Sequence, residues 1–117
     1  MLKLIRGVTQ SIAITITDDD SNIYKLQSGE VLRLGIKRNP QNTDYDVKKE
    51  VSSEALYGDS YVINFAPEDT SDLNPSPEYR FDVGLQTSDG NFYMIIPCSK
   101  CVILPAVTAK EAARHET

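Results

Sequence analysis

Apolar and polar residues alternate along most of this chain, with the period of two that is typical of β-strands buried on one face. The alternation is clearest in residues 10–17, 31–38, 61–65 and 79–86. In residues 79–86, the apolar side chains occupy every second position, and polar residues and a glycine stand between them. Each of these stretches is therefore predicted to be a strand with one face in a core.

A hairpin and several weaker strands complete the pattern. The Asp89-Gly90 pair suits the positive φ of a tight turn, so residues 88–91 are predicted to join 79–86 to a strand at 92–96. Further strands are expected at 101–104 and, with weaker patterns, at 2–6, 23–26 and 46–51. About seven to nine short strands without a long helical pattern predict an all-β antiparallel sandwich or barrel. One domain is expected over residues 1–107.

The last residues, 108–117, differ in kind from the rest. Thr108 followed by Glu111 fits a capping box, and the alanines between the charged residues favour a helix. So short a helix is marginal alone in water. We expect a tail that frays, or that forms a short helix when it docks on a neighbouring subunit.

Composition and charge narrow the classes of function. The chain has 117 residues, 40% of them hydrophobic and 25% charged, which fits one folded domain. Its net charge of −5 repels phosphate backbones, so no nucleic-acid partner is expected. No apolar run approaches the roughly 20 residues of a membrane helix, and residues 1–7 are too short for a secretory signal. We expect a soluble protein made in the cytoplasm, without a membrane partner.

The stretch PEDTSDL, residues 67–73, predicts a single helical turn between two strands, with Leu73 as its apolar contact. Tyr79 follows at the position of the tyrosine corner of immunoglobulin-like sandwiches, whose hydroxyl bonds back to the preceding corner. We expect Tyr79 to be buried with Phe81 and its hydroxyl to reach the backbone of residues 69–73.

An acidic metal or general acid site is the alternative for this corner, with Glu68, Asp69 and Asp72 as its candidates. Adjacent residues on one turn cannot by themselves supply the convergent oxygens that such a site needs. The structural corner is therefore the preferred interpretation.

Other candidate redox, metal-binding or catalytic residues lack the partner residues that such sites need. Cys98 and Cys101 have the spacing of redox and zinc sites, but a following helix or two more ligands are missing, so reduced structural thiols are expected, with a local disulfide or a metal shared between subunits as the alternatives. Residues 18–20 are all aspartate but lack the spacing of a calcium loop. The single histidine, His115, gives little support to a catalytic triad. No catalytic residue, cofactor or metal site is predicted, and the protein is not expected to be an enzyme.

Four segments together resemble the N-terminal domain of phage baseplate upper proteins and related prophage tail proteins of Gram-positive bacteria. The segments are Gly7–Asp18, Gly29–Lys37, Pro67–Leu85 and Gly90–Pro97. The resemblance implies an immunoglobulin-like sandwich that serves as structural material in the virion tail. It also implies assembly as a ring or trimer, with other tail or baseplate proteins as partners. Members of this family commonly continue into a long further region, so the chain is either a small component or a piece of a longer protein.

Interface candidates follow from the strand faces. Val62, Tyr93 and Ile95 lie opposite the faces assigned to the core, so they are expected to contact other subunits. The alternative function is a carbohydrate-binding or adhesive sandwich, which needs exposed aromatic rings. Tryptophan is absent, and Tyr45 and Tyr57 are the main tyrosines outside core-facing positions and turns.

Overall fold

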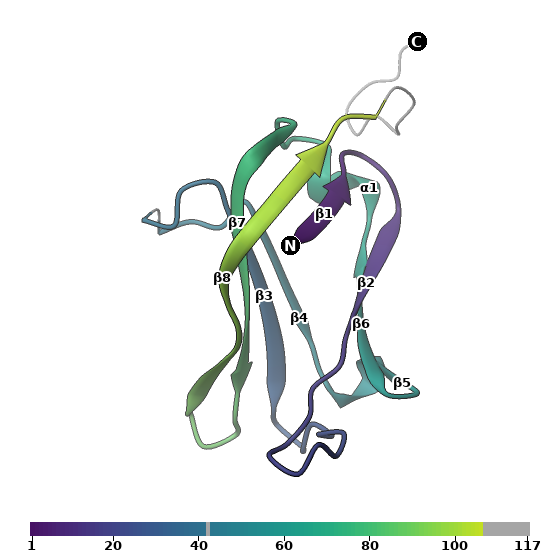
Figure 1. Ribbon diagram of the computed structural model, residues 1–117, viewed down its shortest axis with the longest axis vertical. Helices are drawn as coiled ribbons and strands as arrows, with labels where there is room; N and C mark the ends of the chain where they lie inside the picture. Colours follow the sequence, from purple (N-terminus) through teal and green to yellow (C-terminus); the bar gives the residue numbers. More distant parts are fainter. Residues whose placement is uncertain (42, 107–117) are drawn as a thin grey trace.

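The computed structural model describes residues 1–41 and 43–106, apart from the side chain of Pro77, and it consists mainly of strands (Figure 1). The strands are β1 (Leu2–Ile5), β2 (Gln10–Ile14), β3 (Val31–Lys37), β4 (Val47–Val51), β5 (Leu56–Tyr57), β6 (Ser60–Phe65), β7 (Ser76–Gln86) and β8 (Phe92–Leu104). Two short helical turns, η1 (Ser53–Ala55) and α1 (Pro67–Thr70), lie between strands. The predicted all-β class is confirmed, and α1 is the single turn expected in the corner. The tail predicted at 108–117 lies outside the described residues.

Two sheets form the fold, a five-stranded sheet in the order β1-β8-β7-β3-β4 and a three-stranded sheet in the order β2-β6-β5. Most neighbours are antiparallel, but β1 runs parallel to β8, with Leu2 opposite Cys101. The prediction of a wholly antiparallel sandwich is wrong at this edge. The reason is that no hairpin joins β1 to β8: the chain leaves β1 through Gly7, at φ 74°, and enters the other sheet.

The core lies between the sheets and is built from the alternating positions. Leu32, Leu34 and Ile36 of β3 are fully buried, as are Tyr61 and Ile63 of β6. Each fully buried aliphatic side chain contributes about 2 kcal/mol. The inward positions of β7 are Tyr79, Phe81, Val83 and Leu85, all of them buried.

The segments predicted as separate strands at 92–96 and 101–104 form one long strand, β8. The register between β7 and β8 shifts three times, so extra residues are absorbed as bulges. One of these irregularities lies between Phe81 and Val83, where β8 contains Pro97 and Cys98. A bulge lets the chain pass a proline without ending the strand.

The connection between β2 and β3 is long, and both a few backbone hydrogen bonds and the side chain of Tyr61 hold it. The strand expected at 23–26 forms only an isolated bridge between Thr17 and Ile23, so that prediction is wrong. Instead, the buried Tyr61 hydroxyl accepts a hydrogen bond from the Leu26 N–H (2.7 Å) and donates to the Tyr24 carbonyl (3.1 Å). These bonds tie the connection to the second sheet.

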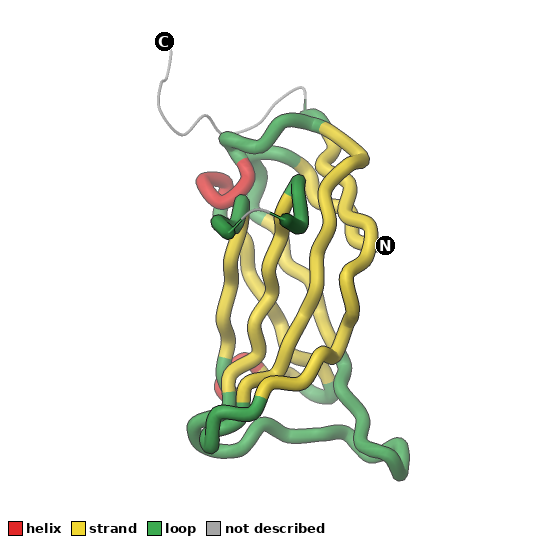
Figure 2. Tube along the Cα trace, turned by 90° about the vertical axis from the view of Figure 1, so that its left-hand side faces the viewer, coloured by secondary structure: helices red, strands yellow, loops and turns green. Residues whose placement is uncertain are grey.

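Loops collect at the two ends of the strands (Figure 2). One end holds the β2–β3 connection, the η1 and β5–β6 region and the β7–β8 hairpin, because Val31 pairs with Gln86, Leu32 with Val51, and Ile14 with Tyr61. The other end holds α1 and the β3–β4 connection. Surface properties can therefore be compared end by end.

Candidate interaction surface

The edge of β8 is only partly covered by its neighbour. β1 pairs with residues 101–104 of this strand and stops there, whereas β8 begins at Phe92. Residues 92–100 pair with β7 on one side, and within residues 1–41 and 43–106 no strand pairs with them on the other (Figure 1). A free edge of this kind presents backbone N–H and C=O groups that can pair with another chain.

Exposed apolar side chains gather at the start of this free edge. Phe92, Tyr93 and Met94 are 51%, 54% and 49% exposed. Ile95 and Ile96 follow and are half-buried against the core. Three consecutive large apolar residues in solvent are unusual on a strand and indicate a contact surface.

Two aromatic rings lie on glycines of the outer face of the five-stranded sheet. A Cβ atom on Gly84 would lie 2.1 Å from the Phe92 ring, and one on Gly35 would lie 2.5 Å from the Tyr45 ring. Each glycine thus leaves room for a ring to lie against the backbone. The Lys37 ammonium lies 4.7 Å from the centroid of the Tyr45 ring, a cation–π distance.

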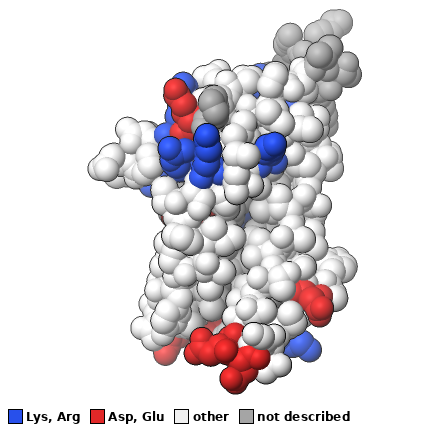
Figure 3. Space-filling model, in the orientation of Figure 1, with Lys and Arg blue, Asp and Glu red and all other residues white. Residues whose placement is uncertain are grey.

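Basic side chains cross the same face in a row. Lys37 is directly opposite Arg80, and Arg80 is directly opposite Lys100, so the three share the outer face on three adjacent strands. Lys3 on β1 is exposed beside Val102 and extends the row to a fourth strand. Figure 3 shows most of the visible Lys and Arg in the upper half of the molecule, with one acidic group beside them at the upper left and most of the visible Asp and Glu at the lower end. We call Lys3, Lys37, Arg80 and Lys100 the basic row.

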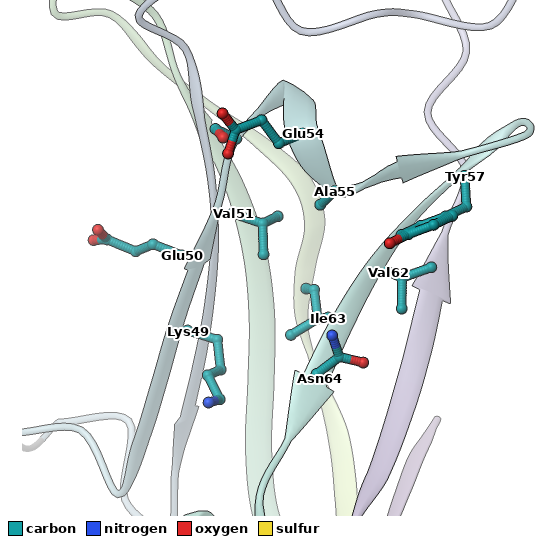
Figure 4. Close-up of a pocket in the computed structure, with 10 residues that line it drawn as sticks. Lys49, Glu50, Val51, Glu54, Ala55, Tyr57, Val62, Ile63 and Asn64 are labelled. Carbon is teal, nitrogen blue, oxygen red and sulfur yellow. The ribbon is translucent and has the colours of Figure 1, made fainter.

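A groove of about 410 Å³ separates β4 from β6 where the edges of the two sheets part (Figure 4). Val51, Ala55 and Ile63 supply apolar walls, and Val62 lies on the β6 side. Lys49 and Glu50 lie on the β4 side. Its lining residues show no arrangement of a nucleophile, base and oxyanion donors.

The acidic corner is used for structure. The Asp69 carboxylate accepts a hydrogen bond from the Ala66 N–H (2.7 Å) and pairs with the Lys49 ammonium (2.8 Å). Burial alone would raise the pKa of Asp69, but the hydrogen bonds from Lys49 and Ala66 and the charge of Lys49 lower it overall. Within residues 1–41 and 43–106, no group of three or more His, Cys, Asp or Glu residues could hold a metal ion.

Leu73, Tyr79 and Phe81 are all buried at this corner. The Tyr79 hydroxyl accepts a hydrogen bond from the Asn74 N–H at 3.3 Å, one residue after the stretch expected from the sequence. Thr70, in α1, receives a shorter bond from the Gly7 N–H at 2.8 Å. The corner therefore joins α1 both to the start of β7 and to the turn after β1.

The two thiols of the CSKC stretch, residues 98–101, differ in their exposure to solvent. Cys98 is exposed and Cys101 is buried, and both are free. Cys101 is paired with Tyr79 on the core side, and burial raises its pKa to about 11. Cys98 instead lines a small depression on the outer face beside Arg80 and Asp82.

The three interface candidates from the sequence do not form one surface. Val62 lies in the β4–β6 groove, whereas Tyr93 and Ile95 lie on β8. Tyr93 is exposed, and Ile95 is half-buried against the core. Sequence reasoning missed Phe92 and Met94, although the run FYM directly after a hairpin signal could have indicated them.

No family model, curated protein or solved structure matches this chain. Among the described residues, no helix is long and apolar enough to cross a membrane.

Proposed function

We propose that this protein is a non-enzymatic assembly module that binds other protein chains along the free edge of β8. The observation that carries the proposal is the free outer edge of residues 92–100, whose first three side chains are large, apolar and exposed. Addition of a strand to a sheet edge draws its affinity from main-chain hydrogen bonds and its specificity from side-chain contacts.

An incoming strand would continue the line of β1 along β8. β1 ends the coverage of β8 at Cys101, so the added strand would run beside residues 92–96, before Pro97. Its side chains would cover Tyr93 and Met94, and contact with these side chains would stabilise the complex by removing apolar surface from water.

The strand order supports an immunoglobulin-like fold. In such sandwiches the strands G, F, C and C′ form one sheet, and B, E and D belong to the other. The orders β8-β7-β3-β4 and β2-β6-β5 have the same succession. A further support is Tyr79, which lies near the start of β7 after α1 and accepts a hydrogen bond from the Asn74 N–H, as the tyrosine of a tyrosine corner bonds to the preceding backbone.

The biological setting that we propose is a phage or prophage tail, where this module is a structural component of the tail or baseplate. The support is the resemblance of the segments Gly7–Asp18, Gly29–Lys37, Pro67–Leu85 and Gly90–Pro97 to baseplate upper proteins. In this setting the partners are further copies of the chain and other tail proteins, and the site of action is the virion tail.

Sedimentation velocity over a range of protein concentrations tests the proposal. We expect the wild type to self-associate and the double variant Tyr93→Lys/Met94→Lys to remain monomeric, because charge on an edge strand opposes pairing. Tyr57→Lys is the matched control, since Tyr57 is 70% exposed on the other sheet. A wild type that stays monomeric, or a double variant that associates as the wild type does, would contradict the proposal.

A carbohydrate-binding module is the second candidate, favoured by the rings of Tyr45 and Phe92 on the outer face. Aromatic rings that lie flat against a sheet can stack on sugars. Gly35 and Gly84 lie on adjacent strands, two positions apart in register, which places the two rings close together. A glycan array with the wild type and the Tyr45→Ala variant separates the candidates: sugar binding that requires Tyr45 by a monomeric protein would favour this second function.

A further inference from the structure

We infer that the basic row of one copy binds the acidic loop end of a second copy. This inference rests on the proposed function, because both require that copies of the chain associate. It adds a second contact, distinct from the β8 edge, and it names the surfaces that meet.

Like charges meet in the basic row of a single copy, and Glu78 and Asp82, two positions on either side of Arg80 on β7, are the acidic residues of that strand on the same face. Like charges directly opposite one another on neighbouring strands destabilise a sheet. Arg80 has Lys37 opposite on one side and Lys100 opposite on the other. Among the described residues, neither Arg80 nor Lys100 forms an ion pair within the chain. An acidic surface over the row would remove this repulsion.

The row also has the dimensions of a contact site. It crosses β3, β7, β8 and β1, which are consecutive in the sheet. Three strand spacings of about 4.8 Å make it roughly 14 Å wide. That width suits a cluster of loops better than a single small ion.

The chain itself provides an acidic surface at the lower end in Figure 3. The three connections that meet at this end expose Asp18, Asp19, Asp20, Glu54, Asp59 and Asp89. In these connections, residues 15–30, 52–59 and 87–91, Lys25 is the single Lys or Arg. This loop end is therefore negatively charged, and the basic row lies in the opposite half of the molecule.

These two surfaces occupy different places on one copy, so their contact is heterologous. A heterologous contact does not close a two-fold dimer and instead continues into rings or chains. Because exposed charges make the contact, it weakens as salt shortens the Debye length from about 10 Å at 0.1 M. We therefore expect species larger than dimers at low salt.

Paired charge reversals test this contact. Arg80→Glu/Lys100→Glu reverses two of the four charges of the basic row. Asp19→Lys/Asp20→Lys reverses two acidic side chains that make no side-chain hydrogen bond among the described residues. Each variant alone is expected to lower the association constant at 50 mM NaCl by about tenfold or more in sedimentation velocity. Asp44→Lys/Asp72→Lys is the matched control for Asp19→Lys/Asp20→Lys, because both of its residues are exposed at the opposite end and it raises the net charge by the same amount.

Mixing the two variants makes the test specific. The acidic face of the first variant then meets the basic end of the second, and the unaltered surfaces of the two also match. An equimolar mixture is expected to regain association that neither variant shows alone. Simple net-charge effects predict no such difference between this mixture and a mixture with the control variant.

The outcomes separate this inference from the proposed function. Association that is unaffected by the reversals and by 500 mM NaCl, but lost in Tyr93→Lys/Met94→Lys, overturns the inference and leaves the β8 edge as the assembly surface. Loss on reversal without rescue in the mixture also overturns the inference. Rescue in the mixture, with wild-type behaviour of Tyr93→Lys/Met94→Lys, supports the inference and contradicts the β8 proposal.

Discussion

Lys49 and Asp69 join the two sheets at the open side of the sandwich, where the Lys49 ammonium lies 2.8 Å from the Asp69 carboxylate. Lys49 belongs to β4, the last strand of the five-stranded sheet, and Asp69 lies in α1, which follows β6 of the other sheet. Lys49 is on the core-facing side of its strand, since it pairs with the buried Leu34. An inward-pointing charge at an edge strand discourages pairing with another chain. The β4 edge is thus protected in a way that the β8 edge is not.

Removal of the Asp69 carboxylate is expected to destabilise the fold. Asp69→Ala loses both the ion pair and the hydrogen bond from the Ala66 N–H, which together contribute about 1–2 kcal/mol at neutral pH. Urea unfolding at pH 7 measures the change. Asp72→Ala, at an exposed neighbouring position, is the control. Its free energy of unfolding is expected to lie within about 0.5 kcal/mol of the wild-type value.

The same contact predicts a pH dependence. The pKa of Asp69 is lower in the folded protein than in the unfolded chain, so its stabilising effect is fully present above the unfolded pKa of about 3.9. It is lost as the pH falls through the folded pKa. The stability difference between wild type and Asp69→Asn should therefore shrink as the pH is lowered from 6 to 3. A difference that grows over this range would contradict the assignment.

Tyr61→Phe is expected to loosen the β2–β3 connection. The substitution leaves the Leu26 N–H and the Tyr24 carbonyl without their partner, and unsatisfied buried groups cost about 1–3 kcal/mol. Thermal unfolding measures the loss, and amide exchange should accelerate at Leu26 in particular. Tyr57→Phe, at an exposed position, serves as the control. Unchanged exchange at Leu26 would show that this hydroxyl does not hold the connection.

The two thiols should react very differently. Cys98 is exposed, while burial raises the pKa of Cys101 to about 11, so Cys101 carries little thiolate at neutral pH. A maleimide is expected to label one thiol in the native protein and both in denaturant. In Cys98→Ser the native protein should remain unlabelled. Rapid labelling of Cys101 in that variant would place its side chain outside the core.

Gly84 is expected to be required for the position of the Phe92 ring. A Cβ atom at Gly84 would lie 2.1 Å from that ring, so Gly84→Ala must displace it. We expect a loss of about 1 kcal/mol, since the ring is half exposed and can move. The loss should largely vanish when Phe92→Ala is already present, as a double-mutant cycle by urea unfolding can show. Additive losses would mean that the ring does not lie on Gly84.

The alternation of side chains was sufficient to predict the strands around β3, β6 and β7, because each has one face in the core. It could not predict the direction of β1, which depends on the path of the chain between the sheets. The alternation also predicted two strands in place of β8, because a bulge at Pro97 interrupts the alternation without ending the strand. The prediction of a strand at residues 23–26 was wrong because hydrogen bonds with the Tyr61 hydroxyl, rather than a neighbouring strand, hold that segment.

The candidate surface was harder to predict than the fold. The prediction that Tyr93 lies opposite the core face is wrong, because Tyr93 pairs with the buried Leu85 and so lies on the core side of β8. Its side chain is exposed all the same, which the alternation of residues does not indicate. The basic row depends on the register of neighbouring strands, because Lys37, Arg80 and Lys100 are far apart in the sequence. The net charge of −5 leaves room for a local basic patch but does not indicate where one lies.

Amide hydrogen exchange at residues 92–96 as a function of protein concentration tests the central claim most directly. If these residues form the assembly edge, their amides should exchange more slowly at high concentration, while the exposed amides of the β5–β6 hairpin stay unchanged. Exchange at residues 92–96 that is independent of concentration, in a sample that does self-associate, would show that the copies meet through another surface.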